Sequence, residues 1–282
     1  SPARRNRMLT MIIDGNCQYF GKADVKGLIG RMDAAGIGRA LLSASLEGAV
    51  IPGRDAPLSG VGNAEVAAAV TAHPDRFIGC FHANPLEPGA PATVAEYAGK
   101  GFKAVKLFPG EGWHPDDPKL YPFFDAVQDA GLAALVQCGI AGFGLSHDGG
   151  TRRALNAAYA YPMRLDAPSR LFPQIRFVIL TMGFPFLFEA WSVHHANKNV
   201  FLDLSGSGPA GGALPVGYAA VGGPAFIPLD FEKVVWGSDN AIDLKAELAV
   251  ADAHLGMMGC ADPERRARAF GDNAARMLGI AG

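Results

Sequence analysis

The sequence predicts a single (β/α)₈ barrel, of the TIM-barrel class, on three observations. Short apolar or β-branched runs alternate with amphipathic helical stretches, which is the pattern of repeated βα units and a parallel sheet. The strand-like runs number eight, as a closed barrel requires. The chain has 282 residues with 49% hydrophobic composition and no long linker, which suits one large core. Residues 1–282 are therefore expected to form one domain, with residues 1–8 disordered or left over from cloning.

The predicted elements follow one another in regular order. Eight short strands are expected at residues 10–15, 39–45, 76–85, 102–110, 132–139, 176–183, 200–206 and 233–240. Six helical patterns between them have apolar residues at spacings of three and four. They cover residues 24–36, 63–74, 92–101, 119–131, 184–197 and 245–256. Each ends near Gly, Asn or Pro, which are residues that commonly stop a helix.

Three connections are too long and too rich in Gly and Pro to be plain βα loops. They span residues 47–62, 140–168 and 206–228, after the second, fifth and seventh predicted strands. The loops that follow the strands of such a barrel form its active-site face. We therefore interpret these three loops as lids or substrate walls, with simple decoration or an oligomer contact as the alternative.

Charge and cysteine content narrow the class of partner. Lys plus Arg total 25 and Asp plus Glu total 27, for a net charge of −2, which favours neither nucleic acid nor an anionic membrane surface. No segment approaches the roughly 18 uncharged apolar residues of a membrane span. The four cysteines form no CxxC pair, which suits a reducing compartment. We predict a cytoplasmic protein that takes a small-molecule substrate, and a homo-oligomer stays open.

The stretch "MIIDGNCQYF" places two amides at the end of the first strand. Three apolar residues run into Asp14, and Asn16 and Gln18 follow at alternate positions. Side chains at alternate positions of a strand point to the same face. Asn16 and Gln18 are therefore expected to point together into the barrel mouth.

Six phrases, in order along the chain, resemble the amidohydrolase-related branch of the amidohydrolase superfamily. That branch includes the aminocarboxymuconate semialdehyde decarboxylase-like enzymes and the dicarboxylate lactonases. The resemblance covers nearly the whole chain and implies a TIM barrel. The phrases are "NAEVAAAVTAHPDRFIGCFHANP", "GKGFKAVKLFPG", "DDPKLYPFFDAVQDAGLAALVQCG", "YAYPMRLDAPSRLFPQIRFVILTMG", "NVFLDLSG" and "VVWGSDNA".

The resemblance also implies a set of metal-ligand positions. The family pattern has two histidines flanking one residue at the end of strand one, one histidine ending each of strands five and six, and an aspartate ending strand eight. The corresponding residues here are Asn16, Gln18, Gln137, Thr181 and Asp239, so that only the aspartate remains.

This exchange argues against a tightly bound catalytic metal. Zinc and its first-row relatives prefer imidazole, thiolate or carboxylate ligands, and a neutral amide oxygen is a poor substitute. The set would offer oxygens to Mg²⁺ or Ca²⁺, but one negative charge makes a weak site. We predict no catalytic metal and no cofactor. The replacements are nevertheless all polar, so the pocket is expected to bind a polar ligand or to close on itself as a hydrogen-bonded network.

Without a metal, side chains must supply the acid or base. Asp239 is the first candidate, because the resemblance places it where the family's aspartate handles the proton; alternatively it anchors a loop or accepts a hydrogen bond from Asn16. His82 is the second, since the two-residue period turns it to the same face as Asn84. The alternative is a hydrogen-bonded structural histidine.

Four other polar side chains are substrate-binding candidates. Lys106 ends the fourth strand and would bind a substrate carboxylate or form a Schiff base, with a salt bridge as the plainer alternative. His114, beside Trp113 in the following loop, is either a substrate contact or solvent-exposed. Gln137 and Thr181 come from the ligand positions above. Cys17 adjoins one of these positions, but alternation turns it away from the pocket.

The predicted function is a metal-independent, amidohydrolase-like hydrolysis of a lactone or related bond in a small carboxylated or oxygenated molecule. Two alternatives stay open. One is a metal-free lyase or cyclase, acting by decarboxylation, carbon–carbon cleavage or dehydration. The other is a non-catalytic pseudoenzyme that binds a ligand or a partner subunit.

Overall fold

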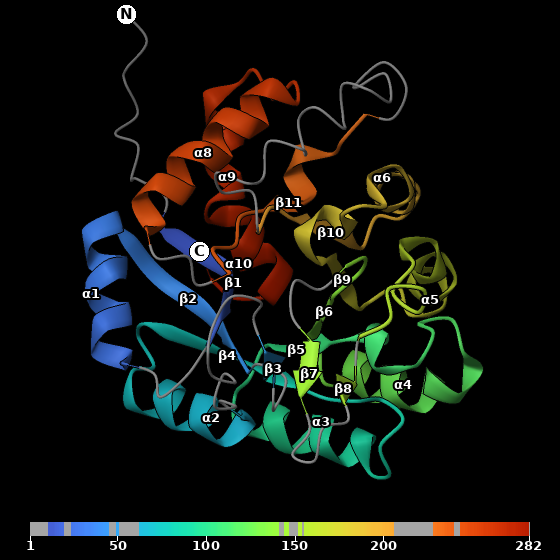
Figure 1. Cartoon of the computed structure of the whole chain (residues 1–282). Helices are drawn as coiled ribbons and strands as arrows, with labels where there is room; N and C mark the ends of the chain where they lie inside the picture. The colour runs from blue at the N-terminus through green and yellow to red at the C-terminus, as the bar shows by residue number, and fades with distance from the viewer. Residues whose placement is uncertain are drawn as a thin grey trace, which may run out of the picture.

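The computed structural model confirms the eight-stranded barrel (Figure 1). It describes residues 11–19, 24–44, 62–140, 155–205, 228–239 and 243–281, and the backbone alone of residues 49–50, 144–146 and 152–153. The parallel strands run in the order β1-β2-β4-β5-β6-β9-β10-β11, and each overlaps a predicted strand. Their bounds are β1 (Ile12–Gln18), β2 (Ile37–Ser43), β4 (Phe77–His82), β5 (Ala104–Leu107), β6 (Ala133–Val136), β9 (Arg176–Ile179), β10 (Val200–Asp203) and β11 (Val234–Val235).

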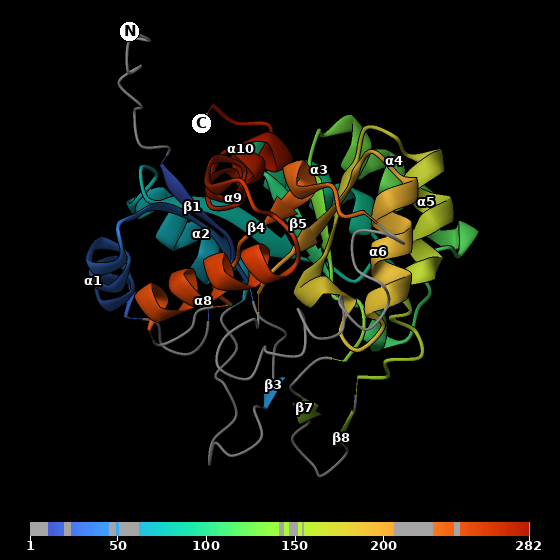
Figure 2. The same ribbon diagram turned by 90° about the horizontal axis from the view of Figure 1, so that it is seen from above.

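Helices surround this sheet, as Figures 1 and 2 show. Six of them match the predicted patterns. These are α1 (Val25–Ala35), α2 (Asn63–Ala72), α3 (Ala90–Gly99), α4 (Tyr121–Asp129), α6 (Leu187–Ala196) and α8 (Leu244–Met257). The sequence patterns did not predict α5 (Asp166–Leu171), α9 (Pro263–Ala269) and α10 (Asp272–Leu278). Helices of six or seven residues are too short to display a clear 3.6-residue period.

Alternation along the strands divides the core into two layers. Inward side chains such as Ile13, Ile78 and Val178 fill the barrel, together with Ala274 and Met277 of α10. The other faces of the strands pack beneath the surrounding helices in a larger cluster, which includes Cys17 and Cys138. The barrel interior is therefore packed solid below its mouth, so polar chemistry is confined to the strand ends.

The barrel closes between β1 and β11 through a short seam. Gly15 N donates to Trp236 O at 2.9 Å, and Asp239 N donates to Asn16 O at 2.9 Å. Nearer the strand starts, the turn between α9 and α10 takes the place of this pairing. Ile13 N donates to Phe270 O at 2.8 Å there. In the described part of the predicted strand 233–240, the regular pairing with β10 is therefore limited to Val234–Val235.

A second, antiparallel sheet lies beyond the mouth of the barrel (Figure 2). It joins β3 (Ala49–Val50), β7 (Gly144–Ser146) and β8 (Arg152–Arg153). These strands belong to the long loops after β2 and β6, two of the three loops predicted as lids or walls. Most of residues 47–62, part of 140–168 and nearly all of 206–228 lie outside the described residues, so their role stays a prediction.

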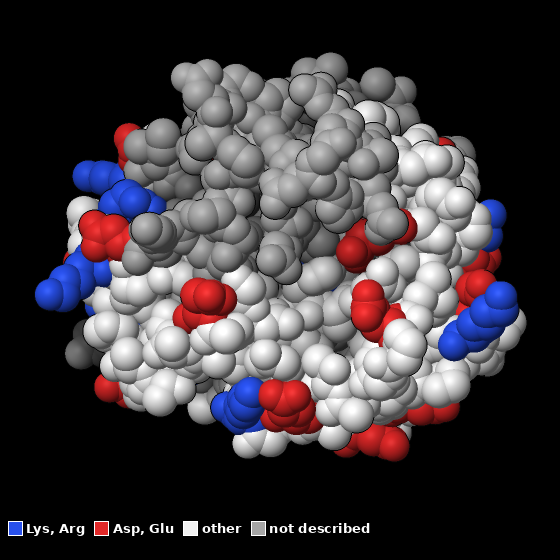
Figure 3. Space-filling model, turned by 60° about the horizontal axis from the view of Figure 1, so that its bottom comes forward, with Lys and Arg blue, Asp and Glu red and all other residues white. Residues whose placement is uncertain are grey.

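The surface and the helix lengths bear on partners. Among the described helices, none is long and apolar enough to cross a membrane. On the face in Figure 3, acidic and basic side chains lie singly or beside one another among uncharged residues, and its described part shows no broad basic patch.

Candidate active site

The end of β1 meets a buried lysine from β5. A register shift between Asp14 and Cys17 marks a bulge in β1, and both Asn16 and Gln18 remain turned inward, 2% exposed each. Lys106 is 1% exposed, and its Nζ donates to Asn16 Oδ1 at 3.1 Å and to Gln18 Oε1 at 2.9 Å. The prediction that the two amides point the same way is correct, and what they meet is an ammonium group.

The opposite side of the Asn16 amide is also held. Its Nδ2 donates to Ser205 Oγ at 3.1 Å and to Asp203 Oδ2 at 3.4 Å. The Ser205 hydroxyl donates to Asp203, and Thr181 N donates to Asp203 Oδ2 at 3.2 Å. One hydrogen-bonded chain thus runs from β5 through β1 to β10 and to Thr181, two residues after β9. We call Asn16, Gln18, Lys106, Asp203 and Ser205 the buried network.

Two polar atoms of the buried network have no hydrogen-bond partner within the described part of the chain. They are Gln18 Nε2 and Asp203 Oδ1. A buried polar group left unpaired costs about 1–3 kcal/mol. A ligand or a water that accepts from Gln18 Nε2, or donates to Asp203 Oδ1, would therefore gain a hydrogen bond.

Asp239 stands at the open end of this arrangement. It follows β11, and its side chain remains exposed in the mouth. The protein around the carboxylate partly desolvates it, which raises its pKa, while the positive charge of Lys106 opposes that rise. Among the described residues no Asn16 side-chain hydrogen bond reaches it, since that amide is directed to Asp203 and Ser205. In the described residues the Asn16 amide therefore donates to other acceptors than Asp239, and a loop-anchoring role of Asp239 stays a prediction.

Backbone strain gathers at the same strand ends. Among the described residues, three that are not glycine have a left-handed φ, namely Thr181 at 50°, Met182 at 49° and Asp239 at 50°. A β-branched residue such as threonine is rarely found there. Such conformations cost of order 1–3 kcal/mol each and cluster at functional sites.

The sequence analysis did not single out two buried carboxylates, Asp14 and Asp203. Ser238 donates to Asp14 from its backbone N at 2.9 Å and from its hydroxyl. Burial raises the pKa of each carboxyl to about 6, and the hydrogen bonds they accept limit the rise. The signal was present in "MIIDG" and "VFLDLS", where one acid interrupts an apolar strand.

His82 belongs to a separate part of the mouth. Its Nε2 lies 3.2 Å from Glu111 Oε2, and the two side chains are 20% and 14% exposed. They line a cavity of about 290 Å³ together with Asn84, Glu87 and Thr93. His82 and Asn84 thus face one cavity, as their spacing predicted. Sequence reasoning missed Glu111, which sits in a short turn after β5 and belongs to no recognisable motif.

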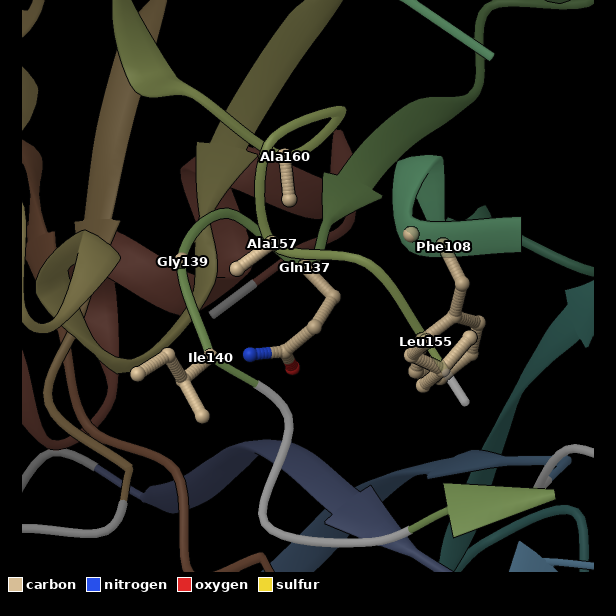
Figure 4. A pocket seen from close by; sticks show the side chains of 8 residues that line it. Phe108, Gln137, Gly139, Ile140, Leu155, Ala157 and Ala160 are labelled. Carbon is tan, nitrogen blue, oxygen red and sulfur yellow. The ribbon is translucent and has the colours of Figure 1, made fainter. Parts of the chain in front are cut away.

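Gln137 and His114 lie apart from the buried network. Gln137 lines a small pocket of about 40 Å³, where Figure 4 shows its amide pointing between Ile140 and Leu155. No hydrogen bond joins this amide to the buried network in the described residues. His114 packs on Tyr159 with ring centroids 4.7 Å apart, so it is partly buried rather than simply exposed. Phe108 lines the Gln137 pocket and also contacts the His82 ring.

The donor set does not fit a divalent metal. The described residues contain no group of three or more His, Cys, Asp or Glu that could hold an ion. The two amide oxygens at the end of β1 already accept hydrogen bonds from Lys106, and an ammonium repels a second cation at such range. We derive no chemical step through a metal.

Comparison with known proteins decides the family. A family model described as amidohydrolase matches residues 47–280. The chain belongs to the amidohydrolase family. No curated protein matches this amidohydrolase chain significantly.

Solved structures share its fold at low sequence identity. An uncharacterised TIM-barrel protein from Bordetella bronchiseptica has TM-score 0.68 and 18% identity, covering 95% of this chain and 98% of its own. The 5-carboxyvanillate decarboxylase of Sphingomonas paucimobilis has TM-score 0.63 and 17% identity, with coverages of 96% and 100%. A probable 2-pyrone-4,6-dicarboxylic acid hydrolase from Acinetobacter baumannii, with citric acid bound, has TM-score 0.64 and 14% identity, covering 95% of this chain and 99% of its own. These likenesses show the barrel fold alone.

Proposed function

We propose that this member of the amidohydrolase family hydrolyses a lactone or related ester bond in a small carboxylated or oxygenated molecule, without a metal. The observation that carries the proposal is the position of Asp239. Its carboxylate is open to the mouth and lies within the electrostatic reach of the buried Lys106. A raised pKa brings a carboxylate closer to the operating pH, which improves it as a general base.

The proposed step needs only water and the ester. Asp239 accepts a proton as the water oxygen forms a bond to the acyl carbon. The acyl carbon–oxygen bond of the lactone then breaks, and the proton on Asp239 passes to the leaving oxygen. The products are one carboxylic acid and one hydroxyl group, so atoms and charge balance. Proton transfer by a positioned side chain is worth roughly 10² to 10⁴ in rate.

Neighbouring groups are assigned to binding and positioning. His82 is held by Glu111 beside the larger cavity, where it would bind a substrate oxygen or protonate the leaving group. Gln137 and Thr181 present an amide and a hydroxyl from neighbouring strand ends. Lys106 is too deeply buried to touch a substrate, and we assign it an electrostatic role beneath the site. A Schiff base at this lysine is not part of the proposal.

The strained backbone favours a working site over a pseudoenzyme. Thr181 and Asp239 both keep left-handed conformations at the mouth. A site retained only for packing gains nothing from strain of this kind, whereas a site that must aim a carboxylate does.

Hydrolysis is tested by assaying a panel of compounds with the purified chain. The panel contains lactones of dicarboxylic acids and hydroxylated aromatic carboxylates, because the likenesses include both a hydrolase and a decarboxylase. Acid release in a weakly buffered assay reports lactone opening, and CO₂ release reports decarboxylation. The proposal expects turnover of a lactone. CO₂ release alone would favour the lyase, and tight binding without turnover would favour a binding protein.

A further inference from the structure

The buried network is built as a cation site whose cation is part of the chain. The Oδ1 of Asn16 and the Oε1 of Gln18 converge on one point, and the Nζ of Lys106 occupies it. The orientation of the Asn16 amide is fixed independently, because its Nδ2 donates to Ser205 and Asp203. The oxygen must therefore point towards β5 whether or not Lys106 is present.

The charges around this point also favour a cation. Asp239 interacts electrostatically with both Lys106 and Asp203. Burying an ammonium costs several kcal/mol unless hydrogen bonds and opposite charge compensate it. Here the two amide oxygens at the end of β1 supply the hydrogen bonds. The carboxylates of Asp239 and Asp203 supply the opposite charge.

We propose that the Lys106 ammonium is a tethered cation that fills the space between β1, β5 and Asp239 and keeps divalent ions out. The consequence is specific. Imidazoles placed at positions 16 and 18 would join Asp239 as three good ligands, but they would bind no metal while Lys106 remains. Removing Lys106 from the same background would open the site. This inference concerns cation binding and holds whatever reaction the protein catalyses.

The test compares two variants that differ only at position 106. One carries Asn16→His and Gln18→His, and the other adds Lys106→Ala. Co²⁺ is titrated into each and followed by its visible absorption, with metal content measured after gel filtration. The variant without the ammonium is expected to bind Co²⁺ on the order of 100-fold more tightly, because like charges at such range repel strongly. Lys103→Ala in the double variant, at an exposed position just before β5, is the matched control and should change nothing.

Equal Co²⁺ affinity in the two folded variants, whether tight or undetectable, would overturn the proposal. A second measurement covers the case in which the triple variant does not fold. Lys106→Ala alone is expected to lower the melting temperature, and propylammonium, which replaces the deleted group, should raise it again. Propanol has a similar size and no charge, so it should not. An equal response to propylammonium and propanol, or no response to either, would also overturn the proposal.

Discussion

The two halves of the barrel mouth differ in how their polar groups are satisfied. In the buried network, most polar atoms bond to one another and every member is almost fully enclosed. The second half consists of Asp239, His82, Glu111 and Gln137, which we call the open groups. These line cavities or face solvent, and only His82 and Glu111 bond to each other among them.

The difference separates two tasks. A closed polar network gains strength from its low dielectric surroundings and holds its members rigidly. It therefore suits a fixed electrostatic role and tolerates little change. Side chains with unused hydrogen-bonding capacity at a cavity suit contact with a ligand. We accordingly expect changes in the open groups to affect turnover, and changes in the buried network to affect stability and its dependence on pH.

The largest effect is expected at Asp239. Asp239→Asn keeps the shape and most hydrogen-bonding capacity but removes the titrating group, so kcat should fall by roughly 10² to 10⁴ with folding intact. Steady-state kinetics on the compound turned over, with thermal unfolding as the check, measures this. Asp125→Asn on α4, at an exposed position, is the matched control. Near-normal turnover of the Asp239 variant would shift the assignment to His82.

The buried carboxyl of Asp203 should make the stability of the fold depend on pH. In the folded chain the pKa of Asp203 is about 6, above the ordinary value of 3.8. Between these two pH values the folded state therefore binds more protons than the unfolded state. The native chain therefore gains stability as pH falls through about 6, a contribution complete below about 4. Relative to Asp203→Asn, this gain between pH 7.5 and 4.5 should be about 2 kcal/mol, measured by urea unfolding.

A control of opposite sign is available on α5. The Arg170 side chain holds the pKa of Asp166 below its usual range. Relative to Asp166→Asn, the native chain should lose stability as pH falls. If the Asp203 comparison showed no change with pH, or the same sign as Asp166, the carboxyl would not be desolvated as the buried network requires.

Gln137 should matter less than Asp239. Gln137→Ala removes one neutral amide from the small pocket, and a water would replace part of its hydrogen bonding. We expect a loss in kcat/KM of about tenfold or less, in line with about 1 kcal/mol for a neutral hydrogen bond. Leu155→Ala in the same pocket separates lost polarity from lost packing. A loss at Gln137 as large as that of Asp239→Asn would place the reaction centre in this pocket instead.

The smallest effect is expected on stability, from changes at Thr181, whose backbone has a left-handed φ. Thr181→Gly should relieve the left-handed strain and stabilise the fold by about 1 kcal/mol, since glycine adopts that conformation readily. Thr181→Ala removes the same hydroxyl and keeps the strain, so it should give no such gain. Chemical denaturation of both variants decides the matter. Equal stability of the two would mean that position 181 stores no strain.

The sequence predicts features that depend on neighbouring residues, and it does not predict contacts between distant ones. The eight strands were predictable because each is a compact apolar run, and the shared direction of Asn16 and Gln18 follows from the two-residue strand period. The contact between Lys106 and these amides was not predictable, because it joins positions about 90 residues apart. Asp203 was treated as part of a strand, since nothing in its neighbours shows that its carboxylate accepts three hydrogen bonds. The shortened β11 depends on the α9–α10 turn, whose short helices give little periodic signal.

The most direct test of the central claim is to measure metal content and turnover on one preparation purified without chelators. The donor set at the strand ends, with Lys106 between the amides, predicts well under one equivalent of zinc, manganese or iron per chain. It also predicts that turnover survives treatment with a strong chelator. Near-stoichiometric metal, removed by the chelator together with the activity, would contradict the account.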